Sequence, residues 1–495
     1  MSAPEAQGTT VAIVGGGISG LAAAWEIVSR PSGSGSPAKV VVFDAAERTG
    51  GKIRTGTVGP VEGIDLGPDA FVTRNSAAVE LCRELGLGDD LVAPAAAGAF
   101  VWARGALRRL PSASFLGVPT RLAPLAQSGI VSRHGVARAG LDLVLPRAAL
   151  GASARADRSV ASIVAPRLGA EVARRLVDPI VGGIHAGSTH DMSAAAVFPE
   201  LLDAARSGGS LMRALGALRA GNSDPRFGED GEAPLAPPPI FQSLRGGLER
   251  LVDALTRSLR ERGVTIHTGA PVTALERQET AWRVVSAATT TDASAVVLAT
   301  PAAVSAQLLA PHAPPATAAL RAIDAASVAI VTLAYRRADV ARSLHGGTGY
   351  LVPDEGARFV TACTWLTTKW AHLANQQGAR DLVVVRASVG RIDDERFARM
   401  DDGDLVAKAH AEIARHMGIR RGPVAQSVTR WEGAFPQYRV GHLDRVAMVE
   451  SAVASTEGIA VCGACLSGVG IPACIAEARR SAAALMAGGT TRAPS

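Results

Sequence analysis

Short apolar runs alternate with longer segments of helical periodicity near both ends of the chain. The run VAIV at 11–14 precedes a glycine-rich turn and the helical pattern LAAAWEIVSR, and the apolar run KVVVFD follows at 39–44. Near the other end, GIAVCG at 458–463 precedes a second glycine-rich turn and the pattern IAEARRSAAALM. Strands that alternate with helices in this way predict βαβ units and a mostly parallel sheet. We therefore expect one α/β lobe whose last strand and helix come from the end of the chain.

The middle of the chain has a different pattern. Between Leu91 and Leu218 the sequence is rich in Ala, Leu and Arg with helical spacing, which predicts an inserted helical section. Residues 222–239 combine Pro, Gly and acidic residues and predict a mobile loop. The segment 241–263 then predicts an amphipathic helix, and later short apolar runs such as SVAIVTLAY and LVVVRASVG predict the strands of a second, mixed domain.

Composition fits an ordinary globular protein. The 495 residues are 47% hydrophobic and 19% charged, with a net charge of +6, and aromatic residues make up only 4%. Without clustered basic and aromatic residues, we expect no nucleic acid partner. The N-terminus lacks the pattern of a secretory signal and the five cysteines are irregularly spaced, so we expect a cytoplasmic protein with reduced thiols. The uncharged stretches 11–25 and 458–476 are broken by glycine and predict strand, turn and helix rather than a transmembrane segment.

The turn after the first predicted strand carries the first chemical signal. Gly15, Gly17 and Gly20 form a GxGxxG string at the start of a helix, and the next predicted strand ends in Asp44. In this context the glycines permit a tight turn and close approach of the backbone to a pyrophosphate, while an acidic strand end can accept hydrogen bonds from a ribose. The pattern therefore predicts dinucleotide binding.

Two further segments follow this motif. Arg48–Thr55 places a second glycine pair and more cations directly after the ribose-binding strand, where another phosphate or flavin contact could form. It is not a Walker loop, because Ala46 stands where a glycine is needed and Ile53 follows the lysine in place of Ser or Thr. The segment Asp65–Phe71, read by its spacing alone, predicts only a turn.

The order of these motifs resembles the FAD-containing amine oxidase superfamily and, within it, the family of bacterial oxygen-dependent coproporphyrinogen III and protoporphyrinogen oxidases. The blocks that narrow the resemblance are DPIVGGIHAGSTHDMSAAAVFPEL, FQSLRGGLERL, TTKW, RWEGAFPQYRVGH and CGACLSGVGIPACI. The resemblance covers nearly the whole chain. It implies an α/β fold, with a Rossmann-like FAD-binding domain, an inserted helical domain and a mixed α+β substrate-binding domain. We expect the FAD-binding domain at 1–90, 236–305 and 441–495, the helical domain at 91–235 and the substrate-binding domain at 306–440.

The resemblance also implies the cofactor and its contacts. We expect one FAD, bound non-covalently because no attachment cysteine can be identified. Val272 would pair its backbone with the adenine edge or be a plain core valine, and Trp431 would pack beside the flavin or fill a domain interface. The residues to which FAD contacts transfer are Gly15, Gly16, Gly17, Ile18, Ser19, Gly20, Asp44, Ala45, Lys52, Gly67, Pro68, Asp69, Ala70, Val272, Trp431, Val469, Gly470, Ile471 and Pro472.

Some positions depart from the family pattern or admit other chemistry. Asp44 replaces the usual glutamate, which shortens its reach to the ribose, and His185 stands where a tyrosine is common. We expect His185 to be a buried histidine with satisfied hydrogen bonds. Cys462 and Cys465 form a CxxC, but no second ligand pair accompanies it. The resemblance implies that this motif lies in the strand–turn–helix that the family places under the flavin. We therefore expect packing thiols and no metal.

The implied reaction is the oxidation of coproporphyrinogen III to coproporphyrin III by O2, with hydrogen peroxide as the other product, in haem biosynthesis. The flavin carries the chemistry, so no catalytic residue is assigned. The four propionates of the substrate predict cations at the edge of the pocket. The candidates are Arg74, Lys369 and Arg439, each of which has a solvated surface cation as its plain alternative.

Other functions stay open beside this one. Protoporphyrinogen IX oxidation is the alternative within the family. Another flavin oxidase or desaturase is disfavoured because the last flavin strand reads VCGACLSG, without the GE pair that amine oxidases tend to have there. A non-catalytic flavin-fold binding protein is disfavoured by the intact glycine motifs. Two partners also stay open: a ferrochelatase that would receive the product, and a membrane surface that the helical section would contact peripherally.

Overall fold

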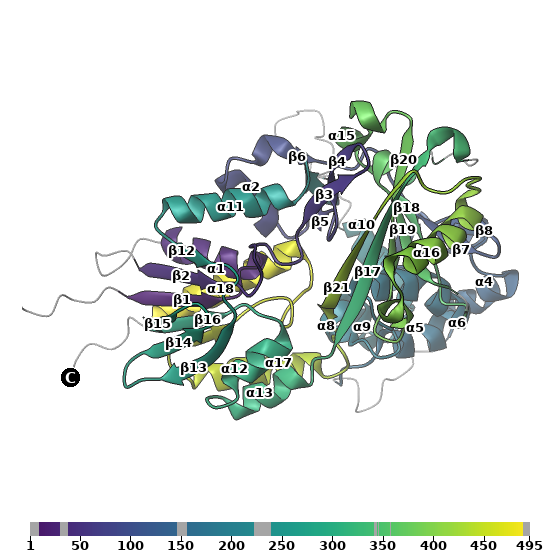
Figure 1. Cartoon of the computed structure of the whole chain (residues 1–495). Coiled ribbons are helices and arrows are strands. Elements are labelled where there is room, and N and C mark those ends of the chain that lie inside the picture. The colour runs from purple at the N-terminus through teal and green to yellow at the C-terminus, as the bar shows by residue number, and fades with distance from the viewer. Residues whose placement is uncertain are drawn as a thin grey trace, which may run out of the picture.

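The computed structural model describes residues 9–29, 38–145, 156–221, 239–340, 344, 346–356 and 358–488. The loop predicted at 222–239 therefore lies outside the described residues except for its last residue. Figure 1 shows two halves, one built on a parallel sheet and the other on a larger sheet with a group of helices beside it.

The parallel sheet has five strands whose neighbours all run in the same direction. Each residue of the run 11–14 is almost completely buried, because the sheet is covered on both faces. This is why its strands are continuous apolar runs rather than alternating ones. The strands, in spatial order, are β12 (Thr265–His267), β2 (Lys39–Phe43), β1 (Thr10–Val14), β16 (Ala295–Leu298) and β22 (Ile459–Val461).

Two layers cover this sheet. Val11 and Ile13 face a core shared with four helices, whereas Ala12 and Val14 face a core shared with a three-stranded antiparallel meander and three helices. The first layer consists of α1 (Ile18–Ser29), α2 (Ala77–Glu84), α11 (Glu249–Glu261) and α18 (Ile471–Gly488). The second consists of β13 (Val272–Arg277), β14 (Trp282–Ser286), β15 (Thr290–Ala293), α12 (Ala302–Leu309), α13 (Pro314–Arg321) and α17 (His442–Ala454).

The segment predicted as one helix at 241–263 begins differently in the structure. Residues Phe241–Leu244 form strand β11, and α11 starts only at Glu249. Gly246 and Gly247 between them have φ of +85° and +99°, a region that right-handed helices exclude. A Cβ on Gly247 would also lie 2.4 Å from the Thr55 side chain. Strand β11 pairs with β5 (Phe71–Val72) and β6 (Leu91–Val92), and β3 (Thr55–Val58) pairs with β4 (Val61–Asp65).

The helical section packs around its own apolar core, which includes Leu125, Val164, Phe198 and Leu215. Its central element is η4 (Ala173–Gly182), a π-helix that contains Pro179. Helices of this type are rare and frequently occur at functional sites. None of the helices in the described ranges combines the length and apolar composition needed to cross a bilayer. The other helices are α3 (Leu122–Ser128), α4 (Arg133–Gly140), α5 (Val160–Leu168), α6 (Ala170–Val172), α7 (Gly183–His185), α8 (Ala194–Val197), α9 (Pro199–Arg206) and α10 (Leu211–Gly221), and β9 (Ser114–Phe115) pairs with β10 (Val118–Pro119).

The second sheet has seven strands and is mixed, with β18 and β7 parallel. Strands β7 and β8 come from the range 91–235 that the sequence assigns to the helical domain. Their residues join this sheet because the run FVWA at 100–103 alternates between half-buried and buried positions, the period of a strand. The strands, in spatial order, are β21 (Ala425–Pro436), β17 (Ala325–Arg336), β20 (Leu382–Val389), β19 (Val360–Trp365), β18 (Gly349–Leu351), β7 (Phe100–Ala103) and β8 (Ala106–Arg109).

Different elements cover the two faces of the seven-stranded sheet. Helix α16 (Asp402–Met417) packs on one face. Part of the other face packs against the hairpin β3–β4 and the short helices α14 (Leu366–Lys369) and α15 (Ala371–Ala374). The hairpin leads into residues 66–70, so the segment predicted to contact FAD lies between the two sheets.

Candidate active site

The glycine-rich turn after β1 has the geometry of a dinucleotide loop. A Cβ on Gly15 would lie 2.6 Å from the Ala299 carbonyl oxygen, and one on Gly20 would lie 1.8 Å from the Gly15 carbonyl oxygen. Both positions therefore need glycine for packing. A Cβ on Gly17, in contrast, would meet no atom within 4 Å. The middle of the turn thus opens into free space at the N-terminus of α1, where a pyrophosphate can approach the backbone.

Asp44 ties this turn to the end of β2. Its Oδ2 accepts a hydrogen bond from the Gly16 amide at 2.7 Å, and its Oδ1 accepts one from the Ala46 amide at 2.8 Å. The Asp44 carbonyl oxygen accepts a hydrogen bond from the Ala270 amide at 2.8 Å. This last contact brings the start of β13, with Val272, to the same end of the sheet.

The second glycine pair lies directly against the first turn. The Gly50 amide donates to the Gly16 carbonyl oxygen at 2.8 Å, and a β-bridge joins Gly17 to Gly50. The Arg48 guanidinium donates hydrogen bonds to the carbonyl oxygens of Thr49, Gly51 and Ile53. Arg48 therefore folds the loop from within, rather than facing a ligand. We call the segments 15–20, 44–54 and 469–472 together the nucleotide cradle.

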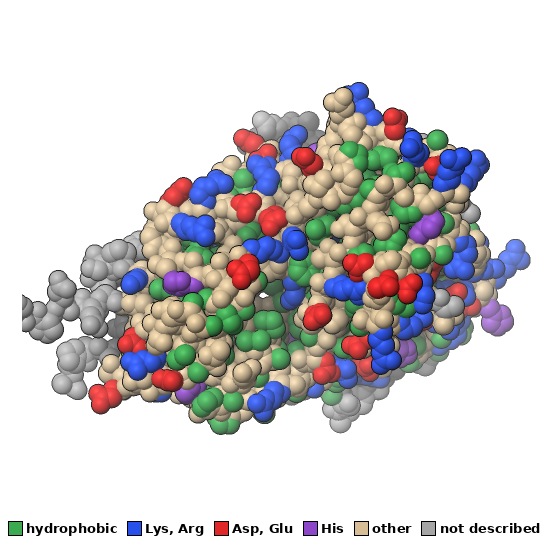
Figure 2. Space-filling model, in the orientation of Figure 1, with side chains coloured by type: hydrophobic (Ala, Val, Ile, Leu, Met, Phe, Trp, Pro, Cys, Tyr) green, Lys and Arg blue, Asp and Glu red, His purple; other side chains and the backbone are tan. Residues whose placement is uncertain are grey.

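Lys52 lies in the cradle directly after the second glycine pair. Its side chain reaches solvent, and the protein atoms around it still lower its pKa by partial desolvation. The nearby side chains of Cys474 and Cys465 partly offset this decrease in the pKa of Lys52. Lys52 therefore lies close to the segment that begins α18. Figure 2 shows a hollow in the face drawn, between the half with the five-stranded sheet and the half with the seven-stranded sheet. A solvent-exposed lysine next to the glycine turns fits a bound dinucleotide, because the phosphates of a dinucleotide are anionic.

The turn at 66–70 joins the cradle to the seven-stranded sheet. A Cβ on Gly67 would lie 2.0 Å from the Lys52 carbonyl oxygen, so the two backbones are in close contact. Trp431 on β21 donates a hydrogen bond from Nε1 to the Leu66 carbonyl oxygen at 2.9 Å. The sequence left two positions open for Trp431, beside the flavin or in a domain interface. This hydrogen bond places Trp431 where the turn at 66–70 meets the seven-stranded sheet.

Asp69 forms a buried ion cluster across that junction. Its carboxylate accepts hydrogen bonds from Lys369 Nζ at 2.8 Å, Arg386 Nη2 at 3.0 Å and Trp370 Nε1 at 3.3 Å. Burial alone would raise the pKa of Asp69, but the charges of Arg386 and Lys369 outweigh it and hold that pKa well below its usual range. Lys369, a candidate for the substrate carboxylates, therefore already has an anionic partner.

The other two candidate cations lie elsewhere. Arg74 forms an ion pair with Glu200 at 3.3 Å and its side chain is 73% exposed. Arg439 forms an ion pair with Asp324 at 2.9 Å. The structure thus gives Arg74, Lys369 and Arg439 three different acidic partners, and their contact with substrate stays a prediction.

His185 is buried, as the sequence predicted, but its hydrogen bonds are not all satisfied. Its Nδ1 has no hydrogen-bond partner, and burial, with the nearby His442, lowers its pKa to about 4. The imidazole ring lies 5.6 Å from the Tyr438 ring, centre to centre. His185 therefore remains neutral at physiological pH and packs as an aromatic side chain.

The cysteines are packing side chains. All five are free and buried. Burial raises the pKa of Cys465 to about 12 and that of Cys462 well above its usual value, which disfavours the reactive thiolate. In the described part of the chain, no three His, Cys, Asp or Glu side chains come together to hold a metal ion.

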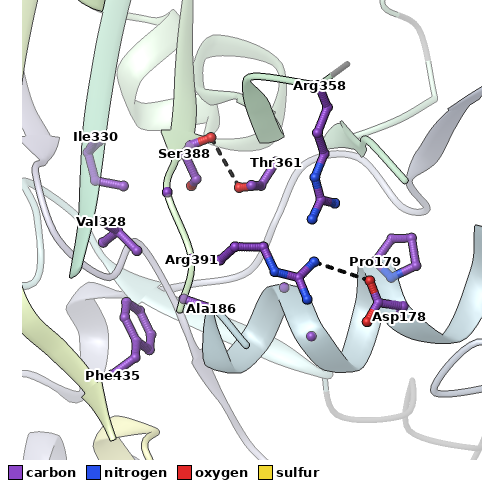
Figure 3. Close-up of a pocket in the computed structure, with 13 residues that line it drawn as sticks. Asp178, Pro179, Ala186, Val328, Ile330, Arg358, Thr361, Ser388, Arg391 and Phe435 are labelled. Carbon is purple, nitrogen blue, oxygen red and sulfur yellow. Dashed lines mark hydrogen bonds and ion pairs between the residues drawn. The ribbon is translucent and has the colours of Figure 1, made fainter. Parts of the chain in front are cut away.

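A small cavity lies between η4, α7 and the seven-stranded sheet (Figure 3). Sequence reasoning assigned no role to its charged residues, Asp178, Arg358 and Arg391, nor to Arg386 in the ion cluster. One signal was present for Arg386, since a lone charge inside the buried run LVVVRASV needs an anionic partner. Nothing local marked Arg358 or Arg391.

Comparison with known proteins places this geometry in a family. The model of the family described as flavin containing amine oxidoreductase matches residues 18–486. The chain belongs to this family. A coproporphyrinogen III oxidase from Bacillus subtilis is 31% identical over 475 residues, which cover 95% of this chain and 96% of that protein. A protoporphyrinogen oxidase from Bos taurus is 32% identical and covers 97% of this chain and 98% of its own length.

Solved structures agree with this family assignment. The crystal structure of a protein from Exiguobacterium sp. 255-15 matches this chain with a TM-score of 0.83 and 28% sequence identity. The match covers 97% of this chain and 99% of that protein chain. The protein is thus a flavin-dependent oxidoreductase with FAD as cofactor. The residues present fit that group: Gly17 borders open space at a helix N-terminus, and the exposed side chain of Lys52 supplies a positive charge in the same cradle.

Proposed function

We propose that this protein is an oxidase that converts coproporphyrinogen III to coproporphyrin III in haem biosynthesis. O2 is the electron acceptor and hydrogen peroxide the second product. The conversion removes six electrons and six protons from the macrocycle, so it consumes three O2 and releases three hydrogen peroxide molecules. A ferrochelatase is the class of enzyme that would then receive the product on the way to haem.

One observation carries the proposal: the turn at 66–70 contacts both the nucleotide cradle and an apolar cluster of the seven-stranded sheet. Trp431 is fixed by its hydrogen bond to Leu66 and packs with Val328 of β17 on the far side of the junction. A flat, hydrophobic macrocycle needs such an apolar surface beside the cofactor. The full-length similarity to proteins named coproporphyrinogen III oxidase supports the choice of substrate.

The residues of the chain position the reactants rather than carry out proton transfer. FAD, when bound, supplies the two-electron acceptor for each step. Gly15–Gly20 and Asp44 would hold its pyrophosphate and ribose, while Lys52 and the turn at 67–70 would border its other end. No side chain is assigned as a base, since loss of a hydride from a meso carbon makes the adjacent pyrrole N–H acidic enough to release its proton to water.

Anaerobic flavin reduction tests the proposal. The holoenzyme is mixed with coproporphyrinogen III or with protoporphyrinogen IX, and bleaching of the flavin band is followed. In a separate aerobic turnover assay at low salt, coproporphyrinogen III should be preferred about tenfold in kcat/KM, because it offers two more carboxylates worth about 0.7 kcal/mol each at a solvated edge. A flavin that neither compound reduces would refute the proposal.

Protoporphyrinogen IX oxidation remains the second candidate. The similarity to the Bos taurus protoporphyrinogen oxidase supports it. Equal or faster flavin reduction by protoporphyrinogen IX in the same experiment would favour this alternative.

A further inference from the structure

The cavity between η4 and the seven-stranded sheet has one apolar side and one cationic side. Val328, Ile330 and Phe435 lie on one side in Figure 3, and Arg358, Arg391 and Asp178 on the other. Its volume is about 60 Å³. That space suits a few water molecules or one short acidic side arm, and it is far too small for a tetrapyrrole ring.

The two guanidiniums differ in how far their charge is satisfied. Arg391 has two carboxylates beside it, with Nη1 3.3 Å from Asp178 Oδ2 and Nε 2.7 Å from Asp393 Oδ1. Its Nη2 donates to the Gly187 carbonyl oxygen at 2.7 Å, while Nε makes no hydrogen bond. Arg358 donates from Nη1 to the Val352 carbonyl oxygen at 2.8 Å. Its Nη2 makes no hydrogen bond.

Arg358 is buried, with 8% of its surface exposed, and its nearest anion is weakly placed. Asp354 Oδ2 lies 3.5 Å from Nη2, and the Asp354 side chain is half exposed to solvent. Among the residues that line the cavity, two guanidiniums face a single carboxylate, that of Asp178. Burial, and next the charge of Arg391, lower the pKa of Arg358, and the charges of Asp354, Asp178 and Asp393 only partly offset this decrease. Arg358 Nη2 is therefore left at the cavity without a hydrogen-bond acceptor.

The cavity also lies next to the part of the seven-stranded sheet that contacts the turn at 66–70. Val328 pairs with Trp431 in the ladder between β17 and β21, and both side chains pack in the same small apolar cluster. Trp431 in turn is hydrogen-bonded to Leu66, beside the segment that borders the cradle. A ring lying against Trp431 would therefore be close to Val328, which lines the cavity.

We propose that the cavity is a carboxylate subsite in which Arg358 Nη2, supported by Arg391, binds one propionate of the porphyrinogen. The macrocycle edge then rests on the apolar side formed by Val328 and Ile330. This assignment rests on the proposed function. It adds to that function the residues that bind one carboxylate group of the substrate.

Binding of the oxidised product to the holoenzyme tests the assignment without turnover. Coproporphyrin III and its tetramethyl ester are titrated in the same mild detergent, and porphyrin fluorescence is recorded. Arg358→Met should weaken binding of the free acid at least tenfold and leave binding of the ester unchanged. Arg358→Lys keeps the positive charge but not the planar guanidinium that can donate two hydrogen bonds to one carboxylate. It should therefore weaken binding of the free acid less than Arg358→Met does.

A second variant leaves the arginine in place. Thr361 lines the cavity, and its hydroxyl donates only to the Ser388 carbonyl oxygen at 3.1 Å. Thr361→Asp should supply an internal anion and weaken binding of the free acid, whereas Thr361→Asn should not. Arg283→Gln is the matched control, since Arg283 pairs with Asp292 at 2.9 Å on an exposed hairpin remote from the cavity.

The outcomes separate the two proposals. If coproporphyrinogen III does not reduce the wild-type flavin, the proposed function fails. If it does, but Arg358→Met or Thr361→Asp binds the free acid as tightly as wild type, the subsite is wrong. Equal losses for acid and ester would also overturn it, because they would indicate general damage to the pocket. Should Arg358→Met fail to retain flavin, the Thr361 pair alone decides.

Discussion

Asp65 makes the stability of this protein depend on pH near neutrality. The side chain is buried at the end of β4, and its Oδ1 accepts hydrogen bonds from Thr55 Oγ1 and from the Leu248 amide, both at 2.8 Å. Burial raises its pKa from the usual 3.8 to about 7. Between these two values the folded state binds a proton that the unfolded state does not. The free energy of unfolding therefore falls as pH rises toward and through 7.

Asp65→Asn removes this dependence while keeping the accepting carbonyl oxygen for both hydrogen bonds. With one pKa unit equal to about 1.36 kcal/mol, the contribution of Asp65 falls by about 1.4 kcal/mol between pH 6 and pH 9. The variant should therefore gain about that much relative to wild type over this interval.

Urea denaturation of the apoprotein at pH 6 and pH 9, followed by tryptophan fluorescence, measures the difference. Asp292→Asn is the control: this exposed carboxylate pairs with Arg283, which lowers its pKa, so it is ionised at both pH values in both states. Parallel curves for wild type and Asp65→Asn across the two pH values would show that Asp65 is already ionised at pH 6, and would refute the reasoning.

Three further predictions concern the cofactor and the junction. Asp44→Ala should weaken FAD binding by about 1.5–3 kcal/mol, with Asp44→Asn losing less, and unchanged flavin occupancy on dilution would exclude Asp44 as the ribose ligand. Acid precipitation should release the flavin into the supernatant, so flavin that remains in the pellet would contradict non-covalent binding. Arg386→Gln should lower stability by about 3–5 kcal/mol, because it leaves the buried Asp69 with Lys369 as its only cation in the cluster; a change in thermal midpoint no larger than that of Arg283→Gln would contradict this.

The sequence was most informative where a local pattern determines structure. The runs at 11–14, 39–43 and 295–298 are apolar at nearly every position because the parallel sheet is covered on both faces, and each is a strand. The glycine turn could likewise be predicted, because its spacing directly after a strand is a local signal. The steric need for glycine at position 15 comes from Ala299, however, which is distant in sequence.

Long-range charge pairing could not be predicted in the same way. Asp69 and Arg386 are separated by 317 positions, and only the tertiary fold brings them to 3.0 Å. Lys369 looked like an available cation because its partner Asp69 is distant in sequence. The predicted helix at 241–263 was wrong at its start because two glycines with positive φ and contact with Thr55 outweigh the amphipathic pattern.

The edge strand β22 and helix α18 have a consequence for biosynthesis. They complete the parallel sheet and one wall of the nucleotide cradle, yet they are among the last described residues to leave the ribosome. The helical section and most of the seven-stranded sheet can fold while translation continues. FAD, in contrast, can be captured fully only after β22 pairs with β16 and α18 packs against α1. The cradle is therefore complete only after residues 459–488 have been synthesised, long after Gly15–Gly20 at its other side.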